Sequence, residues 1–229
     1  MVAVLYDIHG NLPALEAVLV DADQAGAERY VLGGDYALFG PWPAETVDRL
    51  RQLDASWIRG NGERWTANPH EAPDDEVVQA ALAACRDELG AGAVDELAAL
   101  PETLVDSSTR YCHGSPLSDV QSFSPDPSDG DGELLSDANE ECVVFGHTHL
   151  QFRRRAETAT PLDLVNPGSV GMPFDGDCRA AYAIAVPGGG FELRRVEYDS
   201  EESAAAVRAR FPDFGDTVAR RISQASFVT

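Results

Sequence analysis

Residues 2–10 read Val-Ala-Val-Leu-Tyr-Asp-Ile-His-Gly, a short apolar run that ends in two polar side chains and a glycine. The continuous apolar run predicts a buried parallel strand, and Asn11 and Pro13 behind it predict the start of a helix. Residues 29–32 and 56–59 read as further strands, with a helix expected between them. Strand–helix–strand units at this spacing indicate a parallel α/β sheet, in which ligands bind at the carboxyl ends of the strands.

The second half of the chain has a different pattern. Residues 74–100 predict two helices with a break near Gly90, and residues 201–224 predict a helical tail that covers a sheet. The remaining expected strands are 103–105, 111–112, 142–145, 162–165, 180–186 and 191–196. The last three of these are separated by turns and indicate a second, partly antiparallel sheet. The length suits one core, so residues 1–229 are expected to form a single domain.

The composition of the chain indicates in which cellular compartment the protein is expected. The longest apolar runs fall short of the roughly 20 residues that a membrane span needs. The N-terminus enters a strand without a basic region or a cleavage-type sequence, so we expect no secretion. The four cysteines are scattered without a C-x-x-C pair, which is typical of free thiols in a reducing compartment. We therefore expect a cytoplasmic protein without a membrane partner.

The net charge of −22, from 39 acidic residues against 17 basic ones, opposes binding to polyanions. A field of this sign repels nucleic acid and anionic lipid, so neither is an expected partner. All 17 basic residues are arginine. A GC-rich genome and adaptation to high salt both account for this composition. Edge strands in the second sheet favour a homodimer.

Five loops, each after an apolar run, place Asp, His or Asn next to glycine. They are Asp7-Ile8-His9-Gly10, Gly33-Gly34-Asp35, Gly60-Asn61-Gly62-Glu63, His113-Gly114 and Gly146-His147-Thr148-His149. One such loop alone is typical of a surface turn, but four of the five histidines lie in this set. Only His70 lies outside the loops, where we expect it to be exposed. The candidate metal ligands are Asp7, His9, Asp35, Asn61, His113, His147 and His149. These oxygen and nitrogen donors suffice for two divalent ions that act on phosphoesters.

The motifs D-x-H, G-G-D, G-N-x-E, H-G and G-H-T-H, in this order, resemble those of the calcineurin-like metallophosphoesterases, and most closely the small phosphodiesterases of the YfcE type. Residues 166–171, Asn-Pro-Gly-Ser-Val-Gly, add to a likeness that runs from Val2 to about Gly171. It implies a four-layer α/β/β/α sandwich of two mixed sheets with a dinuclear site between them. It also implies one ion held by Asp7, His9, Asp35 and His149, and a second held by Asp35, Asn61, His113 and His147, with Asp35 bridging.

The activity implied by this resemblance is hydrolysis of small phosphoesters by a phosphodiesterase or phosphatase. Two ions lower the pKa of a shared water, and the resulting hydroxide attacks phosphorus in line. Asp35, Asn61 and His113 are the expected catalytic residues. Manganese is the favoured metal, and Fe, Ni, Co or Zn suit the same donors. Two alternatives stay open: a nucleotide or dinucleoside-polyphosphate pyrophosphohydrolase, and a non-catalytic binding scaffold with the same fold.

The loop around Asn61 departs from the family pattern. Many relatives have a histidine at the position of Gly62, where it protonates the leaving oxygen. Because a general acid contributes roughly 10²–10⁴-fold to the rate, we expect weak activity on alkyl monoesters and better activity on esters with good leaving groups. Without that histidine, Glu63 is expected to bind backbone or another imidazole, or to be solvated.

Substrate contacts are expected near the same loops. Arg59 and Arg64 flank Asn61 and suit a substrate phosphate, although a salt bridge is an equal alternative in so acidic a protein. The backbone of Gly114 is expected to approach the phosphate. The aromatic residues of 36–42 are candidates to stack on a base, with a place in the core as the alternative.

Overall fold

The chain begins as two parallel βαβ units. In the computed structural model, which describes residues 1–156 and 162–228, β1 (Val2–Leu5) pairs in parallel with β2 (Arg29–Leu32), and β2 pairs in parallel with β3 (Ala55–Trp57). The connecting helices are α1 (Leu12–Gln24) and α2 (Pro43–Leu50). The Asn11 side chain accepts a hydrogen bond from the Ala14 N–H, as expected of an N-cap.

Two later strands complete this first sheet. β9 (Ala180–Ala185) pairs antiparallel with β1, and β10 (Phe191–Val196) pairs antiparallel with β9, giving the order β10-β9-β1-β2-β3. The prediction that residues 180–186 and 191–196 belong to the second sheet is therefore wrong. β9 lies inside the sheet, with Tyr182 packed on the helices and Ala183 against the other sheet. Apolar patterning marks a buried strand but does not specify its neighbours.

The second sheet has the order β4-β5-β6-β8-β7. Its strands are β4 (Thr103–Asp106), β5 (Thr109–Cys112), β6 (Cys142–Val144), β7 (Phe152–Ala156) and β8 (Leu162–Asn166). β5, β6 and β8 run parallel, whereas the edge strands β4 and β7 are antiparallel to their neighbours. β7 was not predicted, because its central residues are three consecutive arginines, a charged pattern that suits an edge strand.

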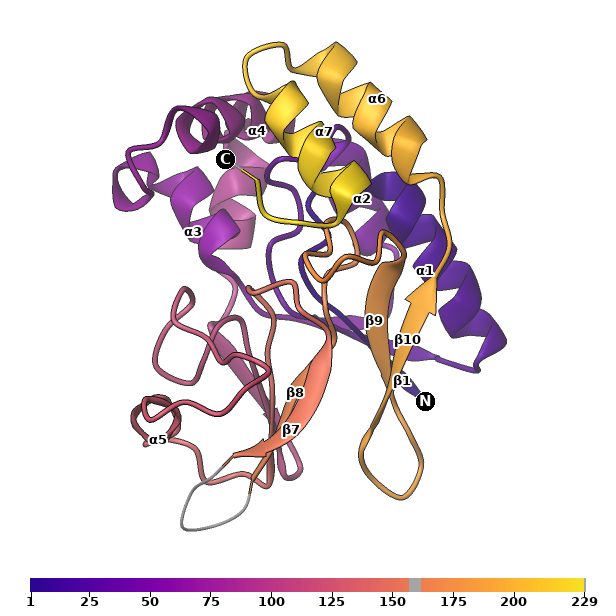
Figure 1. Cartoon of the computed structure of the whole chain (residues 1–229), viewed down its shortest axis with the longest axis vertical. Coiled ribbons are helices and arrows are strands. Elements are labelled where there is room, and N and C mark those ends of the chain that lie inside the picture. The colour runs from indigo at the N-terminus through magenta and orange to yellow at the C-terminus, as the bar shows by residue number, and fades with distance from the viewer. Residues whose placement is uncertain (157–161, 229) are drawn as a thin grey trace.

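The two mixed sheets lie face to face and are flanked by helices, which confirms the predicted α/β sandwich (Figure 1). A small apolar layer that includes Tyr6, Val144 and Ala183 fills the space between the sheets. A larger core packs the outer face of the first sheet against α1, α2, α4, α6 and α7. Over the second sheet the outer layer is thin, because it consists of the short helix α5 (Asp131–Leu134) and loop residues such as Phe123.

The remaining helices lie on the side of the first sheet. α3 (Asn61–Ala67) starts inside a candidate metal-binding loop and was not predicted, and a single 3₁₀ turn, η1 (Pro69–Glu71), follows it. α4 (Glu76–Ala98) contains the predicted break at Gly90, whose φ is +72°. The tail is helical as predicted and forms two helices, α6 (Ser200–Arg210) and α7 (Gly215–Gln224), with Pro212 between them.

No helix among the described residues is both long enough and apolar enough to cross a membrane.

Candidate metal centre

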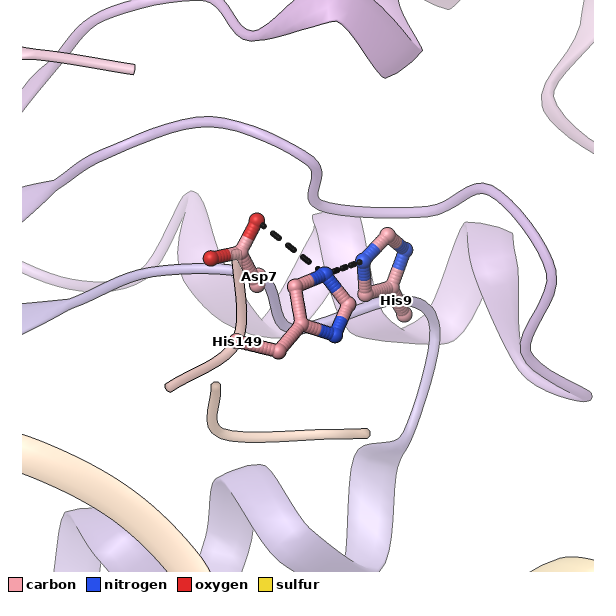
Figure 2. Close-up of side chains that lie close together, drawn as sticks. All are labelled: Asp7, His9 and His149. Atoms are coloured by element: carbon pink, nitrogen blue, oxygen red, sulfur yellow. Dashed lines mark hydrogen bonds and ion pairs between the residues drawn. The ribbon is translucent and has the colours of Figure 1, made fainter. Parts of the chain in front are cut away.

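The seven candidate ligands come from loops that follow five strands. Asp7 and His9 follow β1, Asp35 follows β2, and Asn61 starts α3 behind β3. His113 follows β5, while His147 and His149 follow β6. The parallel strands of both sheets thus end at one shared edge, as expected for an α/β site. Figure 2 shows the side chains of Asp7, His9 and His149 meeting there, although 140 residues of chain separate His9 from His149.

Backbone strain marks the same residues. Asp7, His9, Asp35, His147 and His149 all have left-handed conformations, with φ between +51° and +66°. Such a conformation costs about 1–3 kcal/mol per non-glycine residue and tends to occur at functional sites. Backbone hydrogen bonds hold two of the loops together: the His9 N–H donates to the Asp35 carbonyl at 2.9 Å, and the Asp7 N–H donates to the Gly34 carbonyl at 3.2 Å.

Three imidazole rings are fixed by carbonyl groups. Nδ1 of His9 lies 2.9 Å from the Leu38 carbonyl, Nδ1 of His113 lies 2.8 Å from the Gly33 carbonyl, and Nδ1 of His149 lies 2.5 Å from the Met172 carbonyl. A carbonyl can only accept, so each Nδ1 carries the proton and each neutral ring has its lone pair at Nε2. This second contact is the usual way in which a metal-binding histidine is oriented.

The Nε2 atoms, which carry no proton, then lie close to one another and to the carboxyl groups. Nε2 of His9 lies 3.1 Å from Nε2 of His149, and Nε2 of His149 lies 3.6 Å from Asp7 Oδ1 (Figure 2). Asp7 Oδ1, Asn61 Oδ1 and His113 Nε2 are buried, and none forms a hydrogen bond with a described residue. Unpaired buried acceptors are costly, and a cation among them would satisfy them all. The donor set therefore fits divalent metal ions.

Burial sets the charge of these groups when no cation is present. It raises the pKa of Asp7 to about 8 and raises the pKa of Asp35 well above its usual range. The same burial lowers the pKa of His9 and of His147 to about 3. The imidazoles of His9 and His147 are thus in the neutral form that binds metals, whereas the carboxyl groups of Asp7 and Asp35 need a nearby positive charge to ionise.

The donor atoms fall into two groups that share Asp7. Oxygen or nitrogen atoms of Asp7, His9 and His149 lie within 4.8 Å of one another, and so do atoms of Asp7, Asp35 and His113. His147 borders both groups, because its backbone N–H donates to Asp7 Oδ2 and its ring centroid lies 5.4 Å from that of His113. The structure thus brings the candidate ligands together, while their division between two ions stays a prediction.

The loop between β3 and α3 is braced by Glu63. Its carboxylate accepts hydrogen bonds from the backbone N–H groups of Asp35 (2.9 Å), Tyr36 (2.8 Å) and Gly60 (2.8 Å). Of the three roles considered for Glu63, backbone binding is confirmed. Gly62 donates its N–H to Asp35 Oδ1 at 2.7 Å, and a Cβ atom at Gly62 would lie 2.7 Å from the same oxygen. The position is therefore closely packed against a candidate ligand.

The predicted substrate contacts lie beside His113. Arg64 forms a two-pronged ion pair with Asp119 at 2.6 and 2.8 Å and a further one with Glu71. Arg59 pairs with Glu102. Both arginines line a cavity of about 200 Å³ that His113 also borders, so a substrate phosphate would have to compete with these carboxylates. Their role in substrate binding, like that of the Gly114 backbone, stays a prediction.

A larger cavity of about 720 Å³ opens onto the metal-binding residues. Part of its lining consists of the candidate ligands His9, Asp35, Asn61, His147 and His149. Four aromatic residues and an arginine also line it, namely Phe39, Trp65, Phe174, Arg221 and Phe227. Of the aromatic residues at 36–42, Phe39 reaches this cavity, whereas Tyr36 is buried in the core with its hydroxyl donating to the Leu32 carbonyl. Arg221 and Phe227 were not predicted to lie at the site, because no sequence motif in the tail indicates them.

Known proteins resemble the chain over most of its length. The uncharacterized protein MJ0912 of Methanocaldococcus jannaschii is 28% identical, with 93% of this chain and 95% of that protein aligned. A metallophosphoesterase from Sphaerobacter thermophilus has a similar structure, with a TM-score of 0.83, 26% identity and 98% of each chain covered. The hypothetical protein PH1004 from Pyrococcus horikoshii has a TM-score of 0.85, 22% identity and complete coverage of both chains. Residues 1–186 match the calcineurin-like phosphoesterase superfamily domain. The family predicted from the five loops is thus confirmed, and the chain belongs to the calcineurin-like phosphoesterase superfamily.

Proposed function

We propose that the protein is a metal-dependent phosphoesterase that hydrolyses small phosphodiesters with two divalent ions, preferentially manganese. The observation that carries this proposal is a set of buried acceptor atoms that form no hydrogen bond with a described residue: Asp7 Oδ1, Asn61 Oδ1 and His113 Nε2. Membership of a phosphoesterase superfamily supports the reaction class. Retention of all seven donors at one edge weighs against a non-catalytic scaffold, which would have no use for a strained, unsatisfied polar cluster.

The chain's own residues prepare the site for such ions. When bound, two divalent ions supply Lewis acidity toward phosphoryl oxygens and lower the pKa of water near neutrality. Asp7, His9, Asp35 and His149 are proposed to hold one ion, and Asp35, Asn61, His113 and His147 the other. The carbonyl partners of His9, His113 and His149 keep the proton at Nδ1 and leave Nε2 free. Glu63 fixes the loops that carry Asp35 and Asn61, which limits motion of these donors during the reaction.

The glycine at position 62 supports a preference for substrates with good leaving groups. The Asn61 loop offers a backbone N–H at this position, and that N–H is already used by Asp35. No side chain at residue 62 can protonate a leaving oxygen, so a poor alkoxide leaving group is at a disadvantage. The aryl oxide of an aryl diester and the phosphate of a phosphoanhydride are better leaving groups, which depart without protonation by a side chain.

A nucleotide or dinucleoside-polyphosphate pyrophosphohydrolase is the second candidate function. It is favoured by the aromatic cavity beside the metal-binding residues, which has the size of a small-molecule site (about 300–1,000 Å³). A putative diadenosine tetraphosphatase shares the fold, with 20% identity and a TM-score of 0.55. Hydrolysis of a phosphoanhydride at rates far above those of any diester would favour this candidate.

The experiment that tests the proposal is metal removal and reconstitution. The protein is stripped with a chelator, reloaded with Mn, Ni, Zn or Mg, and assayed on a panel of monoesters, diesters and anhydrides. We expect no activity after stripping, recovery with at least one ion, and loss of activity in His149→Ala. His70→Ala is the matched control, because His70 is exposed outside the site. Activity that survives both stripping and the His149 substitution would contradict the proposal.

We also propose a cytoplasmic location and a homodimer. Free cysteines at residues 85, 112, 142 and 178 support a cytoplasmic location, since a reducing compartment keeps thiols unpaired. The edge strands β4 and β7 of the second sheet support a homodimer.

A further inference from the structure

Part of the wall of the large cavity comes from the C-terminal tail. Arg221 lies in α7 and Phe227 follows that helix, so both lie beyond residues 1–186, which match the family domain. Figure 1 shows the segment after α7 running back toward α3 and α4, and Trp65 and Val78 of those helices line the same cavity. The tail thus adds a surface of its own to a site whose candidate ligands lie in the family domain.

Arg221 is a buried cation without a carboxylate partner. It is 6% exposed, and its Nε donates to the Val228 carbonyl at 2.8 Å. Among residues 1–156 and 162–228 it forms no ion pair, although the chain has 39 acidic residues. Asp75 also lines the cavity and its negative charge acts on Arg221, but the two side chains form no ion pair, and Asp75 Oδ1 accepts from the Val78 N–H. A buried guanidinium usually has an anionic or hydrogen-bonding partner, and no described residue accepts a hydrogen bond from either Nη atom of Arg221.

Aromatic rings surround this guanidinium. Its Cζ lies 4.5 Å from the ring centroid of Phe227 and 5.9 Å from that of Phe39. Phe227 packs edge-on against Phe174 at 5.6 Å, and Phe174 stacks on the imidazole of His149 at 4.3 Å. Phe227 is nevertheless 64% exposed, so much of its ring is free to contact a ligand. A continuous series of rings therefore leads from the metal-binding residues to the tail.

Arg221 lines the same cavity as the candidate ligands without being one of them. The Phe39 ring contacts both Arg221 and His9, with its centroid 5.9 Å from Arg221 Cζ and 5.8 Å from the centroid of His9. Because the candidate ligands and their ions would bind the phosphoryl oxygens, a group that contacts Phe39 and Phe227 would be the organic part of a substrate.

Given the proposed function, on which this inference rests, we propose that Phe227, Phe39 and Arg221 form a base-binding subsite and that the substrates are nucleotides. The rings would stack on the base, and the free Nη donors of Arg221 would bind its carbonyl or ring-nitrogen acceptors. A plain aryl group would use the rings but would leave these donors unpaired. The unpaired guanidinium therefore favours a nucleotide over a simple aryl ester.

Binding of phosphonates to the manganese-loaded protein tests this subsite without turnover. The probes are methylphosphonate, phenylphosphonate and the phosphonate analogue of thymidine 5′-monophosphate, measured by titration calorimetry. We expect the thymidine analogue to bind about tenfold or more tightly than methylphosphonate, the effect of one stacked ring. Phe227→Ala should abolish most of this preference. Val105→Ala, which removes another exposed apolar side chain on β4, should leave it unchanged.

The Arg221→Met variant tests whether the subsite recognises a nucleobase rather than any aromatic ring. We expect it to weaken binding of the thymidine analogue about tenfold, as for loss of a hydrogen bond from a charged donor, and to spare the other two probes. Equal affinity of the wild-type protein for all three probes, no binding of the aromatic probes, or a preference that survives Phe227→Ala would overturn the subsite. Equal binding of phenylphosphonate and the thymidine analogue, both unaffected by Arg221→Met, would overturn the nucleotide class.

Hydrolysis assays on the same protein distinguish failure of the proposed function from failure of the base-binding subsite. Selective binding without hydrolysis of any ester would contradict the proposed function and leave the subsite standing. Hydrolysis of esters without selective binding would contradict the subsite alone.

Discussion

Replacement of Glu63 by glutamine should loosen the two loops that carry Asp35 and Asn61. The Glu63 carboxylate accepts three backbone N–H groups at 2.8–2.9 Å and is only 5% exposed. A glutamine amide presents one oxygen and one NH₂ group, so at least one of the three buried N–H donors loses its acceptor. The substitution keeps the size of the side chain and creates no cavity.

The magnitude follows from these contacts. An unsatisfied buried N–H costs about 1–3 kcal/mol, and the change from charged to neutral acceptor weakens the other two bonds by roughly 1 kcal/mol. The negative charge of Glu63 also opposes ionisation of Asp35, and its removal offsets part of this loss. We therefore expect Glu63→Gln to lower the free energy of unfolding of the metal-free protein by about 2–3 kcal/mol, which for a chain of this size lowers Tm by roughly 4–12 °C.

Urea unfolding of the metal-free protein, followed by circular dichroism, measures this change. Glu28→Gln is the matched control, because Glu28 is exposed. A free energy of unfolding for Glu63→Gln within about 0.5 kcal/mol of the wild type, the usual effect of a surface substitution, would refute the bracing role of Glu63.

Three further outcomes are expected. Manganese affinity should rise by up to roughly tenfold per pH unit as the pH approaches 8. The reason is that burial raises the pKa of Asp7 to about 8 and the metal must displace that proton. Affinities measured by calorimetry that do not change with pH would contradict this expectation. Gly62→Ala should reduce kcat by about tenfold or more, because its Cβ would lie 2.7 Å from Asp35 Oδ1 and a small misplacement of a reacting group is costly. Gly92→Ala, with open space around its Cβ, should leave kcat unchanged, and a Gly62→Ala enzyme as active as this control would count against close packing there. With saturating manganese, an aryl phosphodiester should be hydrolysed far faster than an alkyl phosphate. Comparable rates would contradict the claim that the lack of a general acid at Gly62 disfavours poor leaving groups.

The candidate site could be predicted from the sequence because its chemistry is local. Each donor loop follows an apolar strand and places a donor beside a glycine, so a run such as residues 2–10 specifies both the strand and the ligands after it. The order of these loops along the chain indicated the family. Their convergence then follows from a general property of parallel sheets, whose carboxyl ends meet at one edge.

Other features depend on long-range packing that short patterns do not record. Residues 180–185 have an apolar pattern that suits either sheet, and only pairing with β1 places them in the first. Phe39 and Tyr36 stand three residues apart with similar side chains, yet one lines the cavity and the other lies in the core. Phe227 is an ordinary residue near the end of the chain until α7 places it beside the cavity.

The most direct test of the metal centre is anomalous diffraction at the manganese edge from a crystal soaked in that ion. Our account predicts two strong peaks, one beside His9 and His149 and one beside His113, with the carboxylates of Asp7 and Asp35 in contact with them. Well-ordered side chains at these positions with no anomalous peak among them would contradict it.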